Sequence, residues 1–475
     1  MNFLSQQSKK IFTNSTRITI KLAIIFFLIL AMLIPQQMIK DLVRERQGSQ
    51  ASIERNVAEQ IGGAADVKGP ILCLPYKSYT EVVSIDEQTK KRFTEVETSI
   101  HYAYFTAEEL RVNSEVEVTN KTKGIYKIPF FQAENTLQAI FLLPDFSQWS
   151  GIKAEDILQE EAFILMGISD LKGISETPTL SVNDNTYSFE PGGNGSELFH
   201  SPVHVKLPEN SLGETTELSI SLKLRGTSAL NFASTAKANE VQMTSNWPHP
   251  NFESTMNSQA VVYTEQARHG RNNTLPTERI INDEGFTATW QENQFSIEQP
   301  GQWLGANGHP SLSDRFMGAE FINVADQYDK TTRSVKYMAM IIALVFVAFF
   351  IIELLRANRV HPFQYVLVGS TIAVFFILLL ALSEYLGFDV AYVVAAIATT
   401  GLIGLYSISV FRNRAMAISI SILLLILFAF IFMILTAMEY SLLLGSIGLF
   451  LILAAVMYVT RNVRWYGGIT SHEES

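Results

Sequence analysis

The chain has 475 residues, of which 48% are hydrophobic and 17% are charged, and its formal net charge is −10. This length allows two or three domains. Charge is divided unevenly, because residues 41–336 hold 25 Lys and Arg against 40 Asp and Glu, whereas the rest of the chain holds 11 against 6. A protein that binds nucleic acid needs a basic face. The acidic segment therefore excludes nucleic acid as a partner.

Cys73 is the only cysteine, so a disulfide cannot form within one chain. It lies in the apolar stretch 71–74, which predicts a buried small hydrophobe rather than a reactive thiol. In an oxidising compartment, residues 41–336 would depend on their own hydrophobic core. A segment of this size is long enough to form one.

Residues 18–39 predict a membrane-spanning helix that follows a polar tail at 1–17. Crossing about 30 Å of hydrocarbon takes about 20 apolar residues in a helix. A cleaved signal peptide is the alternative, because Leu22–Ile34 is wholly apolar. No small-x-small cleavage site follows this run, which favours an uncleaved anchor whose Lys21 reaches the headgroups. Residues 41–60 then predict a continuing helix that Gly62 and Gly63 end.

Residues 40–336 as a whole predict a large β-rich domain. Between Leu110 and Val118, and again between Leu218 and Leu224, apolar residues alternate with polar ones, except that Ser114 falls on the apolar side. A period of two predicts half-buried antiparallel strands. Further strands are expected at 71–83, 93–105, 137–143, 162–168, 203–207, 241–245 and 286–294. Together they indicate a sandwich-like domain or two smaller β units.

Five apolar segments follow the β-rich domain, at about 337–355, 362–383, 389–410, 415–436 and 440–460. Each is long enough to cross a bilayer. With the segment at 18–39 they make six transmembrane helices. The expected fold class is therefore an α + β membrane protein in which the antiparallel, sandwich-like domain is inserted between helices 1 and 2. Residues 461–475 form a C-terminal tail.

The distribution of Lys and Arg predicts how these segments are oriented, because cytoplasmic connectors carry an excess of them. Alternate segments are followed by basic pairs, namely Arg356 and Arg359, Arg412 and Arg414, and Arg461 and Arg464. The other two connectors contain neither Lys nor Arg. Both termini are therefore predicted to be cytoplasmic, and residues 40–336 to lie on the opposite side of the membrane. Membrane lipids are the expected partners of the helices.

The sequence carries no strong catalytic, metal or cofactor motif, so we expect a protein that is not an enzyme and has no cofactor. His-Glu-x-x-His, Gly-x-Ser-x-Gly, P-loop and Cys-x-x-Cys patterns are all missing. Ser150 and Lys153 match Ser-x-x-Lys without its companion motifs, and we interpret them as a surface loop. His200 and His204 have the spacing of ligands on a helix, but Pro202 and the alternation around it predict a strand or loop.

The positions of ionisable residues in the apolar segments bear on whether the protein is a transporter. Their ionisable residues, such as Glu353 and Glu384, fall near predicted helix ends, which favours headgroup positions over a transport pathway. Ala396, Thr400 and Gly404 recur every four residues, a pattern typical of a packing seam between helices. A lipid-facing stripe is the alternative.

Two stretches are candidate functional sites. The first is a candidate partner-binding loop formed by Asn246, Trp247, Pro248, His249 and Pro250. Its prolines stiffen the chain and its tryptophan supplies packing area, so a rigid corner packed on the domain's own core is the alternative. The second is a candidate junction between domain and membrane, formed by Asp326, Gln327, Tyr328, Arg333, His361, Pro362, Gln364 and Tyr365. For the stretch 326–336, a well-capped helix start is the alternative.

Several stretches in order along the chain resemble the CreD family of bacterial inner-membrane proteins. They are 68–75, 123–126, 243–252, 326–337, 348–350, 359–369, 378–384, 441–445 and 460–462. Asn-Trp-Pro-His-Pro at 246–250 and His-Pro-Phe-Gln-Tyr at 361–365 are the most specific of these.

The resemblance implies a Gram-negative inner membrane, and so a periplasmic location for residues 40–336. It also implies a link to envelope stress, with membership of a sensor-kinase regulon and tolerance to envelope-directed toxins and antibiotics. The family supplies no catalytic residues to carry over. We therefore expect an envelope-integrity factor whose periplasmic domain binds an envelope or periplasmic protein. The rival hypothesis is a transporter or lipid-handling protein with a cavity among its helices.

Overall fold

The computed structural model describes most of the chain, and the residues it describes are 19–85, 92–149, 151–183, 185–193, 198–252, 272–296, 300–305, 315–321, 327–356, 360–436 and 441–461. The chain divides into two compact units. Residues 51–324 form the first, called the β unit below. Residues 1–50 and 325–475 form the second, called the helical unit.

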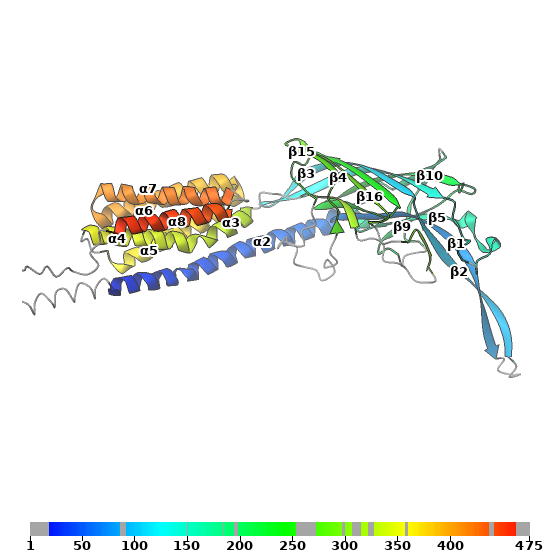
Figure 1. Ribbon diagram of the computed structural model, residues 1–475, viewed down its shortest axis with the longest axis horizontal. Coiled ribbons are helices and arrows are strands. Elements are labelled where there is room, and N and C mark those ends of the chain that lie inside the picture. The colour runs from blue at the N-terminus through cyan, green and yellow to red at the C-terminus, as the bar shows by residue number, and fades with distance from the viewer. Residues whose placement is uncertain are drawn as a thin grey trace, which may run out of the picture. The chain divides into compact units, whose positions relative to one another are not determined.

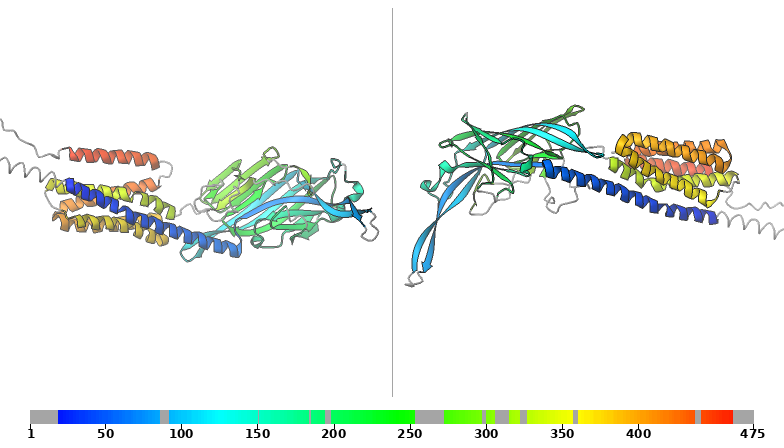
Figure 2. Two further views of the ribbon diagram at one scale, coloured as in Figure 1. Left: turned by 90° about the horizontal axis from the view of Figure 1, so that it is seen from below. Right: turned by 180° about the vertical axis from the view of Figure 1, so that it is seen from behind.

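The β unit is built from two sheets (Figures 1 and 2). The first has the order β13 (Pro250–Asn251), β18 (Arg315–Phe321), β11 (Ala229–Ala233), β1 (Ala65–Ile85), β5 (Phe163–Ile168), β9 (Pro202–Lys206), β8 (Glu190–Pro191), with β14 (Asn272–Asn273) on β18, β2 (Arg92–Thr106) on β1 and β17 (Gln302–Leu304) on β2. The second has the order β15 (Glu278–Asn282), β16 (Gly285–Asn293), β12 (Ala238–Ser245), β3 (Glu109–Lys123), β4 (Tyr126–Leu142), β10 (Thr215–Thr227), β6 (Thr179–Val182), β7 (Asn185–Ser188). Short 3-10 helices lie at Ala154–Asp156, Gln159–Glu161 and Leu171–Gly173.

The alternation predicted for these strands is the pattern of burial that the structure shows. In β3 the side chains of Leu110, Val112, Val116 and Val118 are buried, and those of Arg111, Asn113, Glu115 and Glu117 are exposed. They join side chains from the other sheet in one hydrophobic core. Ser114, the lapse in the pattern, is also buried and donates a 2.7 Å hydrogen bond to Oδ1 of Asn135. A hydrogen bond offsets the cost of burying this hydroxyl.

The sheets are mixed, which corrects the expectation of a purely antiparallel domain. Most neighbouring strands are antiparallel, but β1 and β11, β3 and β12, and β14 and β18 run parallel. Side chains alternate in both kinds of strand, so a period of two cannot tell them apart. The parallel partners here are far apart in sequence, and their pairing depends on long connections that carry no local signal.

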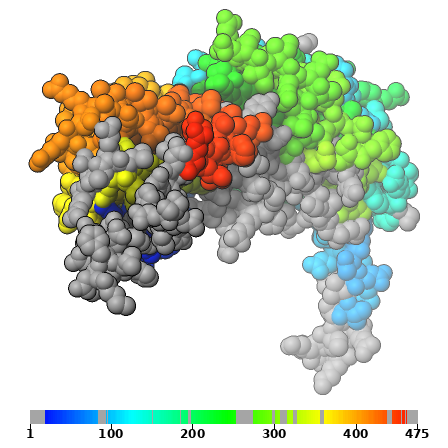
Figure 3. All heavy atoms as spheres, turned by 60° about the vertical axis from the view of Figure 1, so that its left-hand side comes forward, coloured from blue at the N-terminus to red at the C-terminus, as the bar shows by residue number. Residues whose placement is uncertain are grey.

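A two-stranded ribbon extends beyond the body of the first sheet, and Figure 3 shows it standing apart from the rest of the β unit. We call residues 77–85 of β1 and 92–100 of β2 the arm. Within it the two strands pair continuously, from Lys77 opposite Ile100 to Ile85 opposite Arg92. Among the described residues, no other strand pairs with this stretch.

The helical unit begins with the part up to Gln50 of one long helix, Thr19–Ile61, and the part of this helix from Leu33 is α2 (Leu33–Ile61). It continues with α3 (Gln327–Lys336), α4 (Met338–Arg356), α5 (Pro362–Leu386), α6 (Phe388–Phe411), α7 (Arg414–Thr436) and α8 (Ser441–Thr460). Four of the described helices are long and apolar enough to cross a membrane, or five if the pair α3 and α4, bent by 42°, is one span. The count of six spans therefore stays a prediction.

Apolar side chains lie on the outside of the helical unit as well as inside it. Leu405 is 70% exposed and Phe450 is 69% exposed, as expected of a surface that faces lipid. Ala396, Thr400 and Gly404 are buried instead. A Cβ atom on Gly404 would lie 2.4 Å from Oγ of Ser421 on α7, so this stripe is a packing seam between α6 and α7, and the lipid-facing alternative is wrong.

Candidate functional site

The loop Asn246–Pro250 follows β12 and makes a rigid corner. Asn246 accepts a hydrogen bond from the main-chain N–H of Val118 (2.8 Å) and donates one to its carbonyl (3.2 Å), so the amide continues the pairing of β12 with β3. Trp247 is only 8% exposed and packs into the core. Its indole N–H donates to the carbonyl of His249 at 3.1 Å.

Aromatic packing continues after the loop. The ring of Phe252 lies edge-on to Phe286 and to Trp290, with centroids 5.4 and 5.5 Å away. The geometry is that of a corner packed on the domain's own core. Asn246 and His249 are exposed, and Pro248 and Pro250 are partly exposed. A partner that binds this loop must therefore contact these residues rather than the tryptophan ring.

The corner borders an open groove on the solvent face of the second sheet. The groove has a volume of about 570 Å³ and is lined by residues of β3, β4, β10 and β12, with Ser175 and Glu176 beside them. Asn246 is one of its lining residues. The candidate loop thus contributes one residue, Asn246, to the rim of a concave surface, a position that its sequence did not reveal.

The groove is acidic. Its charged lining consists of Glu115, Glu117, Glu134 and Glu176 against Lys223, a sum of −3. Lys223 lies 3.3 Å from Glu134 and 3.0 Å from Glu176, and its hydrogen bonds to these two carboxylates raise its pKa. Glu115 lies directly opposite Glu134 on the neighbouring strand, an arrangement of like charges that is destabilising on its own. A cationic group bound here would relieve that repulsion.

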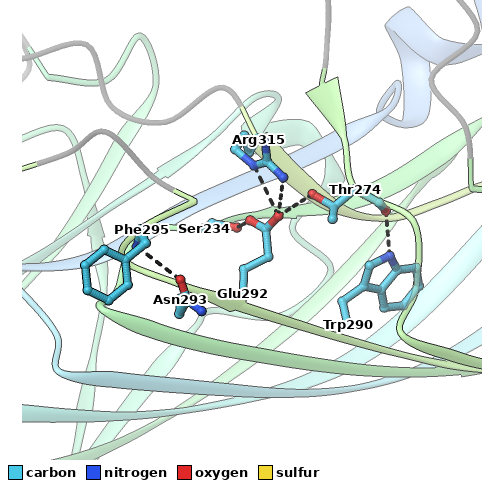
Figure 4. Close-up of polar contacts among 7 residues, drawn as sticks. All are labelled: Ser234, Thr274, Trp290, Glu292, Asn293, Phe295 and Arg315. Atoms are coloured by element: carbon cyan, nitrogen blue, oxygen red, sulfur yellow. Dashed lines mark hydrogen bonds and ion pairs between the residues drawn. The ribbon is translucent and has the colours of Figure 1, made fainter.

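Another carboxylate, Glu292, lies outside the groove and is held inside the β unit (Figure 4). Its side chain is 3% exposed. One of its oxygens accepts hydrogen bonds from Nη2 of Arg315 (2.7 Å) and from the hydroxyl of Thr274 (2.7 Å), and the other accepts from Ser234 (2.5 Å). Burial acts to raise the pKa of Glu292, but these hydrogen bonds and the Arg315 charge outweigh it and hold the pKa below its usual value. A carboxylate so fully bonded is a structural anchor rather than a base.

The predicted junction residues at 361–365 form the capped start of α5. His361 caps α5, because its Nδ1 accepts a hydrogen bond from the N–H of Phe363 at 3.2 Å. Gln364 closes the cap by accepting from the N–H of His361 at 3.0 Å. Pro362 occupies the first turn, where a missing N–H costs nothing. Tyr365 then donates a hydrogen bond to Glu353 of α4 at 3.2 Å.

Glu353 also binds the first helix. Lys21 forms an ion pair with it and donates a 2.9 Å hydrogen bond to the carbonyl of Val360. The side chains of Lys21 and Glu353 are 22% and 12% exposed. We call Lys21, Glu353 and Tyr365 the first clasp, because it ties the N-terminal helix to α4 and α5.

Of the other predicted junction residues, Tyr328 takes part in a second clasp of the same design. Tyr328 of α3 donates a 3.1 Å hydrogen bond to Glu384, and Nε of Arg46 lies 3.8 Å from the same carboxylate. Glu384 is near the end of α5 and Tyr365 is near its start, so the two clasps lie at opposite ends of that helix. The structure therefore does not bring the predicted junction together as one site. Gln327 begins α3, Arg333 is exposed on it, and Asp326 lies outside the described residues.

Other groups that could carry chemistry are occupied or isolated. No group of three or more His, Cys, Asp or Glu that could hold a metal occurs among the residues the structure describes. His204 is bonded through Nδ1 to the carbonyl of Gly192 at 2.8 Å. Cys73 is fully buried, and that burial raises the pKa of its thiol well above its usual value. Ser150 lies outside the described residues.

The sequence as a whole matches a known family. The model of the family "Inner membrane protein CreD" matches residues 17–466. The chain belongs to the CreD family. It is 31% identical over 448 residues to the inner membrane protein CreD of Escherichia coli strain K12, covering 94% of this chain and 93% of that protein. The expected family is thus confirmed, and the chain is an inner-membrane protein with several candidate transmembrane helices.

Sequence reasoning about this CreD-family protein missed the groove, Glu292 and both clasps. Two of the groove glutamates, Glu115 and Glu117, alternate along β3 with buried side chains and look like ordinary solvent-facing residues. Each clasp contains an ion pair, Lys21 with Glu353 and Arg46 with Glu384, whose partners are more than 300 residues apart, which no local pattern can show. The specific motif at 361–365 was a usable signal, since two of its residues cap a helix and a third holds a carboxylate.

Proposed function

We propose that this protein is a non-enzymatic envelope-integrity factor whose β unit lies in the periplasm and binds a basic segment of an envelope protein. The observation that carries the proposal is the acidic groove beside the Asn246 corner. Four carboxylates face one lysine there, and two of the carboxylates lie opposite each other across paired strands. Lysine and arginine side chains of a partner would satisfy these charges.

The proposal includes a topology of six spans with both termini in the cytoplasm. It is supported by the charges of the described connectors. Arg412 follows α6 and Arg414 begins α7, whereas the connection from α5 to α6 is flanked by Glu384 and Asp389. An excess of arginine marks cytoplasmic connections. The helices then serve as an anchor in lipid.

The proposal can be tested with full-length protein in nanodiscs of zwitterionic lipid and a fluorescent pentalysine peptide as probe. We expect Glu117→Lys, which reverses a charge in the groove, to weaken binding about tenfold, and added salt to weaken binding to the original protein. Glu217→Lys is the matched control, because Glu217 is exposed on the same sheet outside the groove. Equal weakening by both variants would assign the binding to net charge and overturn the proposal.

The link to envelope integrity has its own test. Cells that produce only the Glu117→Lys protein should become sensitive to detergent, and cells that produce the Glu217→Lys protein at the same level should not. Detergent resistance in both strains would separate the groove from the envelope role.

A further inference from the structure

The arm has one apolar face that is open to solvent. The exposed fractions of its four described large apolar side chains are 56% for Tyr79, 60% for Val83, 57% for Val96 and 53% for Ile100. A monomeric protein rarely leaves such a group of apolar side chains together at its surface.

The register of the two strands puts all four on the same face. Glu81 lies opposite Val96, and Lys77 lies opposite Ile100. Directly opposed residues project to the same side of a ribbon, as do residues two apart in one strand. Tyr79 and Val83 alternate with Lys77 and Glu81 along β1, so they share this face.

The arm also lacks the support of neighbouring strands. On the β1 side the last described bridge joins Tyr76 to Ile157, and just beyond it the hydroxyl of Tyr79 donates a 2.9 Å hydrogen bond to Asp156. A ribbon of two strands is marginally stable in water and needs further strands or a packed face. Something that covers the apolar face would stabilise the arm.

The order of residues on this face is self-complementary. Consider a two-fold axis that lies between two facing copies of the arm and runs across the strands at the level of Tyr79 and its opposite residue Thr98. Rotation about this axis reverses the direction of the strands. It places Lys77 of one copy over Glu81 of a second copy, and Ile100 over Val96. Positive charge then meets negative charge twice, and apolar side chains meet apolar side chains twice. An unrelated partner would not require this order.

We propose that the arm is a homodimer interface, in which its apolar face packs antiparallel against the same face of a second copy of this chain. A symmetric dimer uses one patch on both copies, so the patch has to be complementary to itself. Tyr79, Val96 and Ile100 form the buried centre, and Lys77 and Glu81 fix the register.

Charge reversal tests the register in full-length protein in detergent micelles, with dimerisation followed by energy transfer between labelled copies. Lys77→Glu should weaken the dimer about tenfold, because it sets glutamate against glutamate at both ends. The double variant with Lys77→Glu and Glu81→Lys should restore the original affinity, since the two charges are only exchanged. Lys206→Glu, an exposed control on β9, should have no effect. A double variant as weak as the single one would overturn the proposal.

A cross-link tests which face is buried. Cys73 is fully buried, so an introduced cysteine is the reactive one. Thr98→Cys lies near the two-fold axis and should give a dimer with a short bis-maleimide. Thr80→Cys is exposed on the opposite face of the same arm and should not. No dimer from Thr98→Cys, or equal amounts from both variants, would contradict the proposed interface.

Discussion

The two units of the chain bury similar side chains but expose opposite ones. Along β3 the exposed positions are Arg111, Asn113, Glu115 and Glu117, whereas on the helices they include Leu405 and Phe450. The apolar surface of the helical unit suits lipid, and the polar surface of the β unit suits water. Removing apolar side chains from water drives the folding of the β unit. Helices surrounded by lipid gain little from such burial, because lipid is itself apolar.

The units are alike in how they hold carboxylates. Glu292 in the β unit is bound by Arg315 and two hydroxyls, and Glu384 in the helical unit is bound by Arg46 and the hydroxyl of Tyr328. In each case a cation and a hydroxyl come from distant parts of the sequence. Polar contacts of this kind fix which elements meet, whatever surrounds them.

The largest expected difference between the units comes from matched truncations in the two cores. Phe232 of β11 and Phe376 of α5 are both fully buried. Phe232→Ala should lower the free energy of unfolding by about 4 kcal/mol. Phe376→Ala should cost about 2 kcal/mol or less, because separated helices keep an apolar environment in lipid. Denaturant unfolding followed by tryptophan fluorescence for the β unit and by circular dichroism for the helices measures both, and equal losses would contradict the comparison.

Glu292→Gln should cost the β unit about 2 kcal/mol at pH 7, since charged hydrogen bonds are replaced by weaker ones. The pKa of Glu292 is lower in the folded protein than its usual value of 4.5. Its ionised form therefore contributes stability that is present above about pH 4.5 and is lost as the pH falls through the lowered pKa. Unfolding curves of the two proteins should converge at low pH. A constant gap from pH 7 to pH 3 would show that the carboxylate is not ionised in the folded state.

The seam in the helical unit can be broken by adding volume. Gly404→Val should destabilise the packing of α6 on α7 by about 2 kcal/mol, because the new side chain meets Ser421. Gly401 lies one turn away with no atom within 4 Å of an added Cβ, so Gly401→Val is the matched control. Thermal unfolding in micelles should separate the two variants by several degrees.

The smallest expected effect concerns the second clasp. Tyr328→Phe removes the hydrogen bond to Glu384 and should cost about 1 kcal/mol. In a double-mutant cycle with Glu384→Gln, the two losses should not add. Additive losses would show that the two side chains do not interact.

The sequence predicted well wherever a local pattern carries the structure. The alternation at 110–118 and 218–224 marks β3 and β10, and Gly62 follows the end of α2 at Ile61. Prediction from the sequence failed where strands pair with partners that are distant in the sequence. The strands β11 and β18 are short and largely buried, so they show no clear alternation. The groove arises only when β3, β4, β10 and β12 lie side by side. The parallel pairing of β3 with β12 has no signal in the local sequence.

The most direct test of the groove as a binding surface is photo-crosslinking in intact cells. Gln132 lines the groove, and Gln138 is exposed on the same face of β4 but outside it. A photoreactive residue at position 132 should cross-link to a basic envelope polypeptide, and the product should disappear when Glu117→Lys is added. The same residue at position 138 should give no such product. Equal cross-linking at both positions, or none at position 132, would contradict the account.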